Sequence, residues 1–273
     1  MEDVRRRLAG FLREDISGGD ATGAILSNKR IRARIISRQE GIVAGVSPVR
    51  QLFALRGCST KMIQRDGSRT RRNQTILEIS GPARNVLSCE RTALNLLSRM
   101  SGIATATNEM VRRVKGASKK TDLYSTRKTA PGLRYFDKEA VEIGGGKKHR
   151  ITLHDMIMIK DNHIAAEGSL VRLIQRAKKR SKVFEVEVDN TEDAVLAASM
   201  GTPIIMLDNF TTAEIKRTIL VLKKLGLRDK VRLEASGGIS HDNIADYART
   251  GVDMISVGSI TNSARAIDYS LEV

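Results

Sequence analysis

The first third of the chain contains short segments in which apolar and polar residues alternate. IRARIISR at 31–38 has apolar residues at every second position over its first half, and TILEIS at 75–80 is a second strand candidate. Such alternation indicates a strand with one buried and one solvent-facing side. GIVAG at 41–45 follows the first strand candidate, and RDGSR at 65–69 has the composition of a turn. This part of the chain therefore predicts a mixture of strands and helices.

A helical period replaces the alternation between residue 83 and about residue 114. The apolar residues at that spacing are Val86, Leu87, Ala93, Leu94, Leu97, Ile103 and Met110. Ser101 and Gly102 interrupt the pattern, and glycine weakens a helix interior. The spacing predicts a pair of helices broken near this dipeptide.

After Thr121 the chain repeats a simple unit, in which a short apolar segment is followed by an amphipathic stretch. The strand candidates are residues 122–125, 156–159, 183–188, 203–207, 231–235 and 253–257. The helical patterns between them cover residues 132–142, 168–180, 191–200, 212–225 and 241–249. This repetition predicts parallel strands joined by crossover helices. Six such units, with a seventh that the pattern could conceal, favour a closed β/α barrel over an open sheet.

The last residues, 264–273, fall outside this repetition and are expected to return to the N-terminal region. A chain of 273 residues is long enough for two modest domains. We therefore expect an N-terminal domain at 1–102, a β/α barrel at 103–260 and a terminal segment at 261–273 that rejoins the N-terminal domain.

The composition is that of an ordinary globular protein, with 41% hydrophobic residues. No apolar run approaches the roughly 20 residues that a membrane-spanning helix needs, and the first residues lack the apolar stretch of a signal peptide. We expect a cytoplasmic protein with no membrane partner. Cys58 and Cys89 are too few for a disulfide framework and are not spaced for zinc, so they are expected to be small buried hydrophobic residues.

The formal net charge of +16 is the most unusual bulk property. A strongly basic chain fits nucleic-acid binding, and it fits equally an enzyme whose small-molecule substrates are polyanions. Aromatic residues make up only 3% of the chain and tryptophan is absent, which argues against a binder of single-stranded nucleic acid. Charge alone leaves both classes open.

Polar residues follow each of the six predicted barrel strands, where the chemistry of a β/α barrel gathers. Cations follow the first two strands, carboxylates end the middle two, and glycine-containing turns follow the last two. In chain order these groups are Thr126-Arg127-Lys128, Lys160-Asp161-Asn162-His163, Glu187 with Asp189, Asp208-Asn209, Ser236-Gly237-Gly238 and Gly258-Ser259.

Each group has a chemical interpretation. A cationic pocket for a compact dianion could be formed by Arg127, Lys128, His149, Arg150 and Lys160, since arginine contacts carboxylates in a fork and lysine acts as a point charge. If Glu187 and Asp208 converge, they could hold Mg²⁺, directly or through water. The turns at 235–240 and 256–259 each stand between a strand and a helix and could bind phosphate through backbone N–H groups.

Other polar residues have simpler explanations. Lys147 and Lys148 are expected to be solvated surface charges, and His154 and His241 are expected to be structural. Glu185 shares a strand face with Glu187, and its favoured role is as a structural partner for a buried cation.

Ten segments, taken together, resemble one known family. They are EDISGGDAT (14–22), RDGS (65–68), CERTALNLLSRMSGIAT (89–105), TRKTAPGLR (126–134), GGGKKHR (144–150), IKDNHI (159–164), EVEVDN (185–190), IIMLDNF (204–210), LEASGGI (233–239) and ISVGS (255–259). In this order they are similar to the quinolinate phosphoribosyltransferases, the carboxylating nicotinate-nucleotide pyrophosphorylases. The combination is specific, although no single segment would suffice.

The resemblance implies an α/β protein with an N-terminal α/β open-faced sandwich domain and an incomplete C-terminal barrel of seven strands. It implies transfer of a phosphoribosyl group from phosphoribosyl pyrophosphate to quinolinate with Mg²⁺, giving nicotinate mononucleotide, pyrophosphate and CO₂ in NAD biosynthesis. It also implies a homodimer, or a hexamer built from dimers.

Roles for individual residues follow from the same resemblance. Quinolinate binding is implied for Arg91, Thr126, Arg127, His149, Arg150 and Lys160, with Arg91 reaching the pocket from a neighbouring subunit. Binding of phosphoribosyl pyrophosphate is implied for Lys128, Ser236, Gly237, Gly238 and Gly258. Catalytic roles are implied for Lys128, Glu187 and Asp208, and the last two are the implied metal site.

Two alternatives stay open at this point. One is a phosphoribosyltransferase for another pyridine acid, such as nicotinate, and the other is a basic nucleic-acid-binding protein. A related group encoded with molybdate transport shares the scaffold, but the intact GGGKKHR loop at 144–150 argues for quinolinate.

Overall fold

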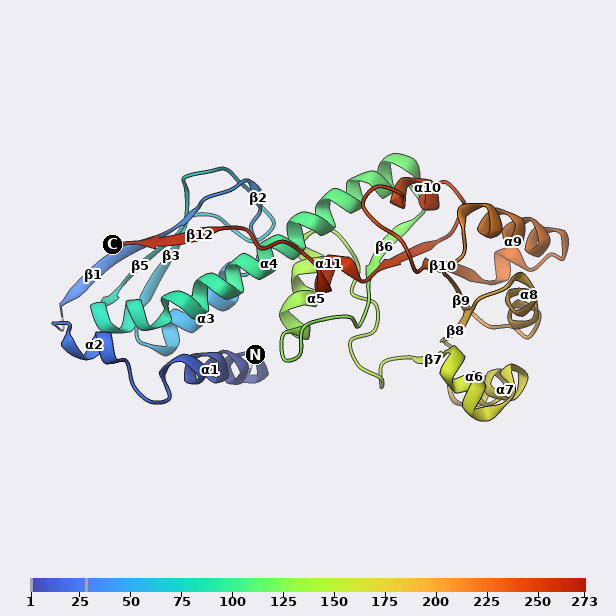
Figure 1. The fold of residues 1–273 in the computed structure, drawn as a ribbon, viewed down its shortest axis with the longest axis horizontal. Helices are drawn as coiled ribbons and strands as arrows, with labels where there is room; N and C mark the ends of the chain where they lie inside the picture. The colour runs from blue at the N-terminus through green and yellow to red at the C-terminus, as the bar shows by residue number, and fades with distance from the viewer. Residues whose placement is uncertain (1, 28) are drawn as a thin grey trace. The chain divides into compact units, whose positions relative to one another are not determined.

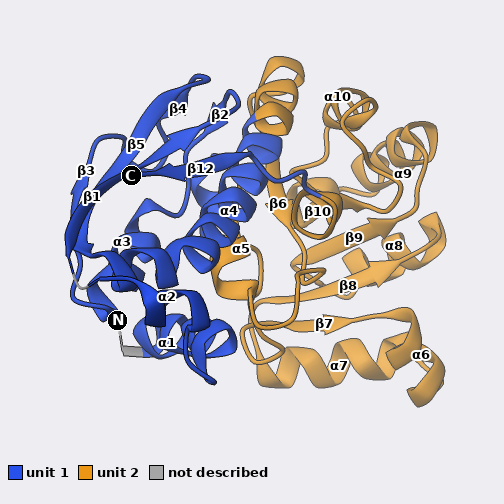
Figure 2. Ribbon diagram, turned by 60° about the vertical axis from the view of Figure 1, so that its left-hand side comes forward, with its two compact units in different colours: residues 1–108, 139–145, 264–273 blue, residues 109–138, 146–263 orange. Residues whose placement is uncertain are grey.

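The computed structural model describes residues 2–27 and 29–273. The chain forms two compact units (Figure 2). Unit 1 comprises residues 1–108, 139–145 and 264–273, and unit 2 comprises residues 109–138 and 146–263. In the described residues no helix is long and apolar enough to cross a membrane.

Unit 1 contains a four-stranded antiparallel sheet and several helices (Figure 1). The strand order is β12 (Tyr269–Glu272), β1 (Arg30–Ser37), β5 (Gln74–Pro82) and β3 (Ser59–Met62). The short strands β2 (Gly41–Ile42) and β4 (Arg69–Thr70) pair separately. The helices are α1 (Glu2–Ile16), α2 (Ala21–Ile25), α3 (Val46–Leu55) and the first part of α4 (Ala83–Ala117).

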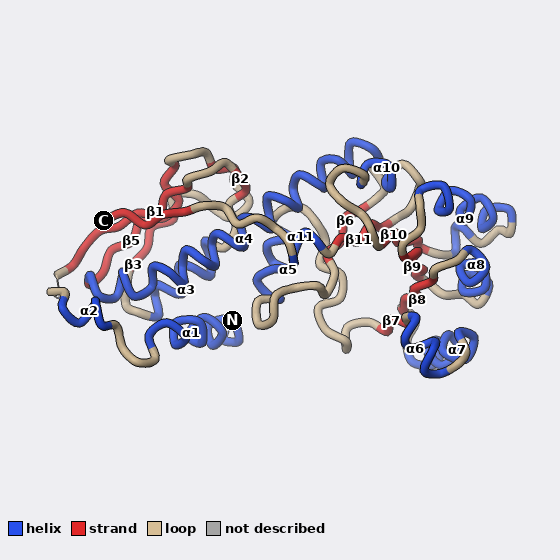
Figure 3. The backbone as a smooth tube through the Cα atoms, viewed as in Figure 1, coloured by secondary structure: helices blue, strands red, loops and turns tan. Residues whose placement is uncertain are grey.

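The strands that the alternation predicts at 31–38 and 75–80 are confirmed, because β1 and β5 cover these residues almost completely (Figure 3). On β1, Ala33 and Ile35 are buried in the core, whereas Arg32 and Arg34 are exposed. Burial of one side chain in two is what a sheet covered on a single face requires. The last strand, β12, pairs antiparallel with β1, so that residues 269–272 complete the sheet of unit 1. Both cysteines are buried and free, as expected.

The predicted break near Ser101 and Gly102 is wrong, because α4 is one continuous helix of 35 residues. The Ser101 hydroxyl is buried and bonds the backbone N–H and C=O of Ala44 at 3.0 and 3.1 Å. A Cβ atom on Gly102 would lie 2.1 Å from the carbonyl oxygen of Arg265. The dipeptide therefore lets neighbouring segments approach the helix closely, and it does not end the helix.

Unit 2 contains a parallel six-stranded sheet in the order β6-β11-β10-β9-β8-β7. The strands are β6 (Asp122–Ser125), β7 (Ile157–Ile159), β8 (Phe184–Val188), β9 (Ile204–Asp208), β10 (Arg232–Ser236) and β11 (Met254–Val257). The connecting elements are α5 (Arg134–Ile143), α6 (Asp161–Glu167), α7 (Leu170–Arg180), α8 (Thr191–Ser199), α9 (Thr212–Lys224), η1 (Arg228–Lys230), α10 (Ile244–Ala248) and α11 (Ser259–Asn262). All six predicted strands are confirmed, and so is the α/β class.

The seventh barrel strand is reduced to a single parallel bridge between Tyr124 and Lys147. Lys147 donates its N–H to Leu123 O at 2.8 Å, and Ser125 N–H donates to Lys147 O at 2.9 Å. The pairing stops there because His149 has a left-handed backbone with φ of 53°, which turns the chain out of the sheet. Unit 2 is therefore a partial barrel with β7 at its other edge.

Helix-capping residues stand directly after the polar ends of several strands. Asn190 caps α8 by accepting the Asp193 N–H, and Thr211 caps α9 in a reciprocal capping box with Glu214. After β8 and β9 the loop is therefore short, and the next helix fixes its backbone. Polar side chains collect at these strand ends.

Candidate active site

A pocket of about 380 Å³ lies at the carboxyl ends of the unit 2 strands. Its lining residues are Ser125, Thr126, Arg127, Lys128, His149, Arg150, Met158, Lys160, Glu187, Met206, Asp208, Glu234, Ser236 and Ser256. The sequence-predicted residues among them are Thr126, Arg127, Lys128, His149, Arg150, Lys160, Glu187, Asp208 and Ser236. The fold therefore brings residues from most of the strand ends into one cavity.

One side of the pocket carries two arginines. The Arg150 guanidinium donates to Met156 O at 3.3 Å and to the Met158 Sδ atom at 3.0 Å. Burial and the neighbouring charge of Arg127 lower the pKa of Arg150. The buried Nε of Arg127 has no hydrogen-bond partner within the described chain. Two like charges held together in a half-buried cavity favour binding of an anion.

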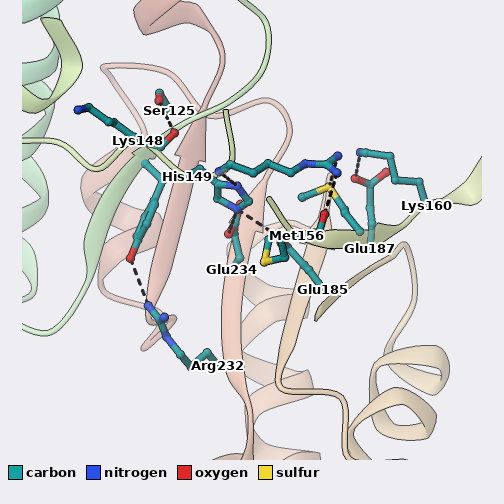
Figure 4. A network of polar contacts seen from close by, with 12 residues as sticks. Ser125, Lys148, His149, Met156, Lys160, Glu185, Glu187, Arg232 and Glu234 are labelled. Atoms are coloured by element: carbon teal, nitrogen blue, oxygen red, sulfur yellow. Dashed lines mark hydrogen bonds and ion pairs between the residues drawn. The ribbon is translucent and has the colours of Figure 1, made fainter. Parts of the chain in front are cut away.

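Carboxylates occupy another side of the pocket. Glu187, at the end of β8, is ion-paired with Lys160, which follows β7 (Figure 4). Asp208 ends β9 and accepts a hydrogen bond from the Asn209 side chain at 2.7 Å. Burial and the negative charge of Glu187 raise the pKa of Asp208. The predicted acidic pair thus lies in one cavity, and one of its members already has a cationic partner.

The glycine-containing turns contribute backbone close to these groups. Gly237 has φ of 86°, and a Cβ atom there would lie 2.1 Å from Asn209 Oδ1. A Cβ atom on Gly258 would lie 2.9 Å from Cδ of Lys128. Glycine is therefore required at 237, whereas at 258 the flexible Lys128 side chain would have to move; Gly237, Gly238 and Gly258 are not among the lining residues.

His149 and Glu234, which line the pocket, form a buried cluster with Glu185 (Figure 4). The Nε2 atom of His149 lies 3.2 Å from an oxygen of Glu234 and 3.3 Å from one of Glu185. Burial by itself lowers the pKa of His149, but the two glutamates outweigh it and raise the value to about 9. Burial and the charge of Glu234 raise the pKa of Glu185 to about 7. Glu185 therefore lies beside a buried imidazole, which is close to the role expected from the sequence, that of a structural partner for a buried cation.

Sequence reasoning missed Glu234 and Lys138. Glu234 is a fully buried carboxylate inside the apolar segment VRLEA, and that position alone was a signal. Lys138, on α5, is 1% exposed and donates to the backbone oxygens of Lys148 and Ser125. Burial, with the charges of nearby arginines, lowers the pKa of Lys138 to about 8. No sequence pattern distinguished this lysine from the many exposed ones.

The remaining predicted residues lie elsewhere. Arg91 is an exposed residue of α4 in unit 1 and does not line the pocket. Lys147 is a surface charge, as expected, and pairs with Asp122 at 2.6 Å. His154 is exposed, and His241 accepts a hydrogen bond from Arg113 at 2.8 Å, so neither lines the pocket.

Models of a known protein family match both parts of the chain. A model of the N-terminal domain of quinolinate phosphoribosyl transferase matches residues 19–101, and a model of its C-terminal domain matches residues 103–272. The chain belongs to the quinolinate phosphoribosyltransferase family. Its two family domains between them account for nearly the whole sequence.

Curated relatives of this family are similar over almost their full length. The chain is 44% identical over 255 residues to a probable carboxylating nicotinate-nucleotide pyrophosphorylase of Archaeoglobus fulgidus, covering 93% of this chain and 98% of that protein. It is 34% identical to the human nicotinate-nucleotide pyrophosphorylase, covering 96% of this chain and 89% of the human protein. The solved structure of the Francisella tularensis enzyme superimposes with a TM-score of 0.91 at 38% identity, covering 98% of this chain and 95% of that chain.

In this member of the quinolinate phosphoribosyltransferase family, Glu187 and Asp208 fit a magnesium ion. Both carboxylate residues line one cavity, and carboxylate oxygens are the donors that hard divalent cations prefer. Burial and, after it, the negative charge of Glu187 disfavour the ionised form of Asp208 and raise its pKa, and a bound cation would offset both effects.

Proposed function

We propose that this quinolinate phosphoribosyltransferase transfers the phosphoribosyl group of phosphoribosyl pyrophosphate to quinolinate, releasing pyrophosphate and CO₂ and leaving nicotinate mononucleotide. The observation that supports this function best is the presence of two arginines and two strand-end carboxylates in one pocket. Such a cavity offers cations to a pyridine dicarboxylate and anions to a sugar carbon that becomes positive.

The arginines account for the acid substrate. Arg127 and Arg150 present guanidinium groups, which bind carboxylates in a fork, and Lys160 supplies a further charge. Holding the pyridine ring in this way aims its nitrogen at the anomeric carbon. Such positioning can supply several kcal/mol, up to about 7–11 kcal/mol in ideal cases.

The acidic side accounts for the sugar. As the bond between the anomeric carbon and pyrophosphate breaks, positive charge develops on the ribose carbon before the pyridine nitrogen bonds to it. Glu187 and Asp208 stabilise that charge, and Lys128 offsets the negative charge of the leaving pyrophosphate. The turns at Ser236, Gly237, Gly238 and Gly258 are proposed to receive the phosphate of the sugar.

Loss of CO₂ follows from the chemistry of the ribosylated ring. The bond between the carboxylate and the ring carbon next to the pyridinium nitrogen breaks, CO₂ leaves, and the electron pair of that bond stays on the ring carbon, where the positive nitrogen stabilises it. No base is needed for this step, and a proton from solvent then takes the place of the carboxylate on the carbon. Magnesium bound by Glu187 and Asp208, directly or through water, would add positive charge beside the pyrophosphate. Titration of activity against Mg²⁺ after chelation tests this cofactor, and full activity in a chelator would contradict it.

The same proposal includes an assembly and a location. Arg91, exposed on α4, would enter the pocket of a second subunit in a homodimer or in a hexamer built from dimers. If so, an inactive Arg91→Ala protein mixed with an inactive Lys160→Ala protein should regain activity, since mixed dimers would contain one intact site. The cytoplasmic location expected from the sequence belongs to this proposal and can be checked by cell fractionation.

One incubation distinguishes the proposed function from its alternatives. The protein is supplied with phosphoribosyl pyrophosphate, Mg²⁺ and either quinolinate or nicotinate, and CO₂ and pyrophosphate are followed. Quinolinate should yield both products. If pyrophosphate forms with nicotinate but not with quinolinate, the substrate is another pyridine acid. If neither acid is turned over and the protein binds nucleic acid in a strongly salt-dependent way, it is a nucleic-acid-binding protein.

A further inference from the structure

The imidazole of His149 is held on both sides by the protein. Its Nδ1 atom accepts the backbone N–H of Arg150 at 2.8 Å, and its Nε2 atom faces the oxygens of Glu234 and Glu185 at 3.2 and 3.3 Å. The side chain is 7% exposed, and both glutamates are fully buried. Neither ring nitrogen is therefore directed at a substrate in the pocket.

These contacts decide which nitrogen carries the ring proton. Arg150 N–H is a donor, and it can bond to Nδ1 only if that atom is unprotonated. The two glutamates raise the pKa of His149 to about 9 and so favour a doubly protonated imidazolium. An imidazolium would, however, place its Nδ1–H and the Arg150 N–H, two donors, 2.8 Å apart, and this contact with Arg150 decides against it. The proton is consequently on Nε2, from which it is donated to Glu234.

The same reasoning separates this cluster from a metal site. His149, Glu185 and Glu234 offer ligand atoms within 4.8 Å of one another, which is close enough to surround a cation. A metal would need the lone pair of Nε2, and that nitrogen carries a proton while Arg150 bonds to Nδ1. The geometry points to a hydrogen-bonded support and not to a ligand set.

The support acts on Arg150. His149 has φ of 53°, a left-handed conformation that costs a residue with a side chain about 1 kcal/mol or more. Such a backbone persists where the surroundings fix it, and here the ring contacts do so on both sides. The residue that follows directly is Arg150, whose guanidinium lies beside Met156 and Met158 in the pocket.

We propose that Glu234 is a positioning residue that orients the ring of His149, and that His149 in turn fixes Arg150 instead of binding a substrate carboxylate through a ring nitrogen. The kinetic test of this proposal rests on the proposed function, whereas the spectroscopic test does not. The chain has four histidines, so the ring signals of His149 can be assigned by their loss in a variant.

The spectroscopic test is ¹⁵N NMR of protein labelled at histidine, at neutral pH, with Zn²⁺ absent and then present. His149, assigned with His149→Asn, should show an unprotonated Nδ1 and a protonated Nε2, with no change on adding Zn²⁺. The opposite tautomer, an imidazolium, or a zinc-dependent shift of Nε2 would overturn the proposal. Each result is obtained whether or not the protein turns over quinolinate.

The kinetic test compares variants that keep or remove the side-chain oxygen of Glu234 that accepts the Nε2 proton of His149. Glu234→Met should raise the KM for quinolinate about 10-fold or more, with little change in the KM for phosphoribosyl pyrophosphate, in the range typical of residues that orient a ligand-binding group. Glu234→Gln retains an acceptor oxygen and should recover most of the loss. Glu192→Met, at an exposed glutamate of α8, is the matched control and should behave as wild type.

Variants of His149 separate support from direct binding. His149→Asn places an acceptor oxygen near the position of Nδ1 and tolerates a left-handed backbone, so it should recover much of the quinolinate affinity that His149→Met loses. Equal loss in both variants would show that the imidazole itself contacts the substrate. If wild type shows no turnover at all, the proposed function fails. The NMR result still decides whether the ring of His149 is held with its proton on Nε2.

Discussion

The two units bury different kinds of polar group. The core of unit 1 is mainly apolar. Among its described residues, the buried serine, threonine and charged side chains are Ser37, Thr70, Ser101 and Thr107, all of which carry hydroxyls. Unit 2 buries hydroxyls too, but it also buries Asp137, Lys138, Glu185 and Glu234. Burying a charge costs far more than burying a hydroxyl unless partners compensate. Among the described residues, the buried charged side chains thus all lie in unit 2, the unit that contains the pocket.

The largest expected effect is the loss of a pocket cation. Arg150→Ala should lower kcat/KM for quinolinate about 100-fold or more, because charge-assisted hydrogen bonds to a carboxylate contribute about 1.5–3 kcal/mol each. The KM for phosphoribosyl pyrophosphate should change little. Steady-state kinetics with each substrate varied in turn measures the two effects.

The matched control for that variant lies in unit 1. Arg34 is exposed on β1, so Arg34→Ala removes the same charge from the chain without touching the pocket. Its kinetics should stay close to wild type. Similar losses in both variants would mean that overall charge, and not the pocket, attracts the substrate.

The buried charge of Lys138 should make the stability of unit 2 depend on pH. Its pKa is about 8 in the folded protein against 10.5 as the ordinary value, so between these values only the unfolded chain holds the proton. Stability from this group is therefore present above pH 10.5 and is lost as the pH falls through about 8. Relative to Lys138→Met, wild type should gain on the order of 3 kcal/mol across this window.

Urea unfolding of both proteins at several values between pH 7 and 10.5 tests that expectation. Subtracting the two curves removes every group that they share. Parallel curves would mean that Lys138 stays protonated in the folded state.

A smaller effect is expected from a buried hydroxyl of unit 1. Ser101 bonds the backbone of Ala44 and receives the Tyr269 hydroxyl at 3.0 Å. Ser101→Ala should lower the free energy of unfolding by about 1–3 kcal/mol, because it leaves the buried polar groups of Ala44 and Tyr269 without their hydrogen-bond partner, while kcat/KM stays unchanged. Ser199→Ala, at an exposed serine, is the control and should stay within about 0.5 kcal/mol of wild type. A loss of activity in Ser101→Ala would weaken the contrast between the units.

The smallest effect belongs to an exposed ion pair of unit 1. Lys61 and Glu78 lie 3.3 Å apart, with their side chains 74% and 44% exposed. Lys61→Ala should change the free energy of unfolding by less than about 1 kcal/mol, and by less still in high salt. A larger change in thermal or urea unfolding would show that charges matter equally in both units.

Much of the fold was predictable because its signals are local. The six strands of unit 2 were found from short apolar segments, and β1 and β5 from alternation, since burial of a strand leaves its period in the sequence. The interruption at Ser101 and Gly102 misled because the same residues that break a helix also permit close packing against one. Only the position of Arg265 beside Gly102 distinguishes the two cases.

The site was predictable to a similar extent. Strand ends converge in any parallel sheet, so the order of cations, carboxylates and glycines along the chain already placed most pocket residues together. The partners within the pocket were not predictable. Lys160 pairs with Glu187, 27 residues away, which depends on the alignment of β7 with β8. His149 pairs with Glu234, 85 residues away, which depends on where the loop after Lys147 meets β10.

The sequence by itself determined the positions of the strands, the sign of the charge at each strand end and the family to which the motifs belong. Those properties depend on residues close together in the chain. Tertiary structure alone decided that the seventh strand shrinks to a bridge at Lys147, that α4 continues unbroken, and that Glu234 and Lys138 are buried beside the pocket. Burial and tautomer are set by side chains brought together from distant segments, and no periodicity in the sequence encodes which ones will meet.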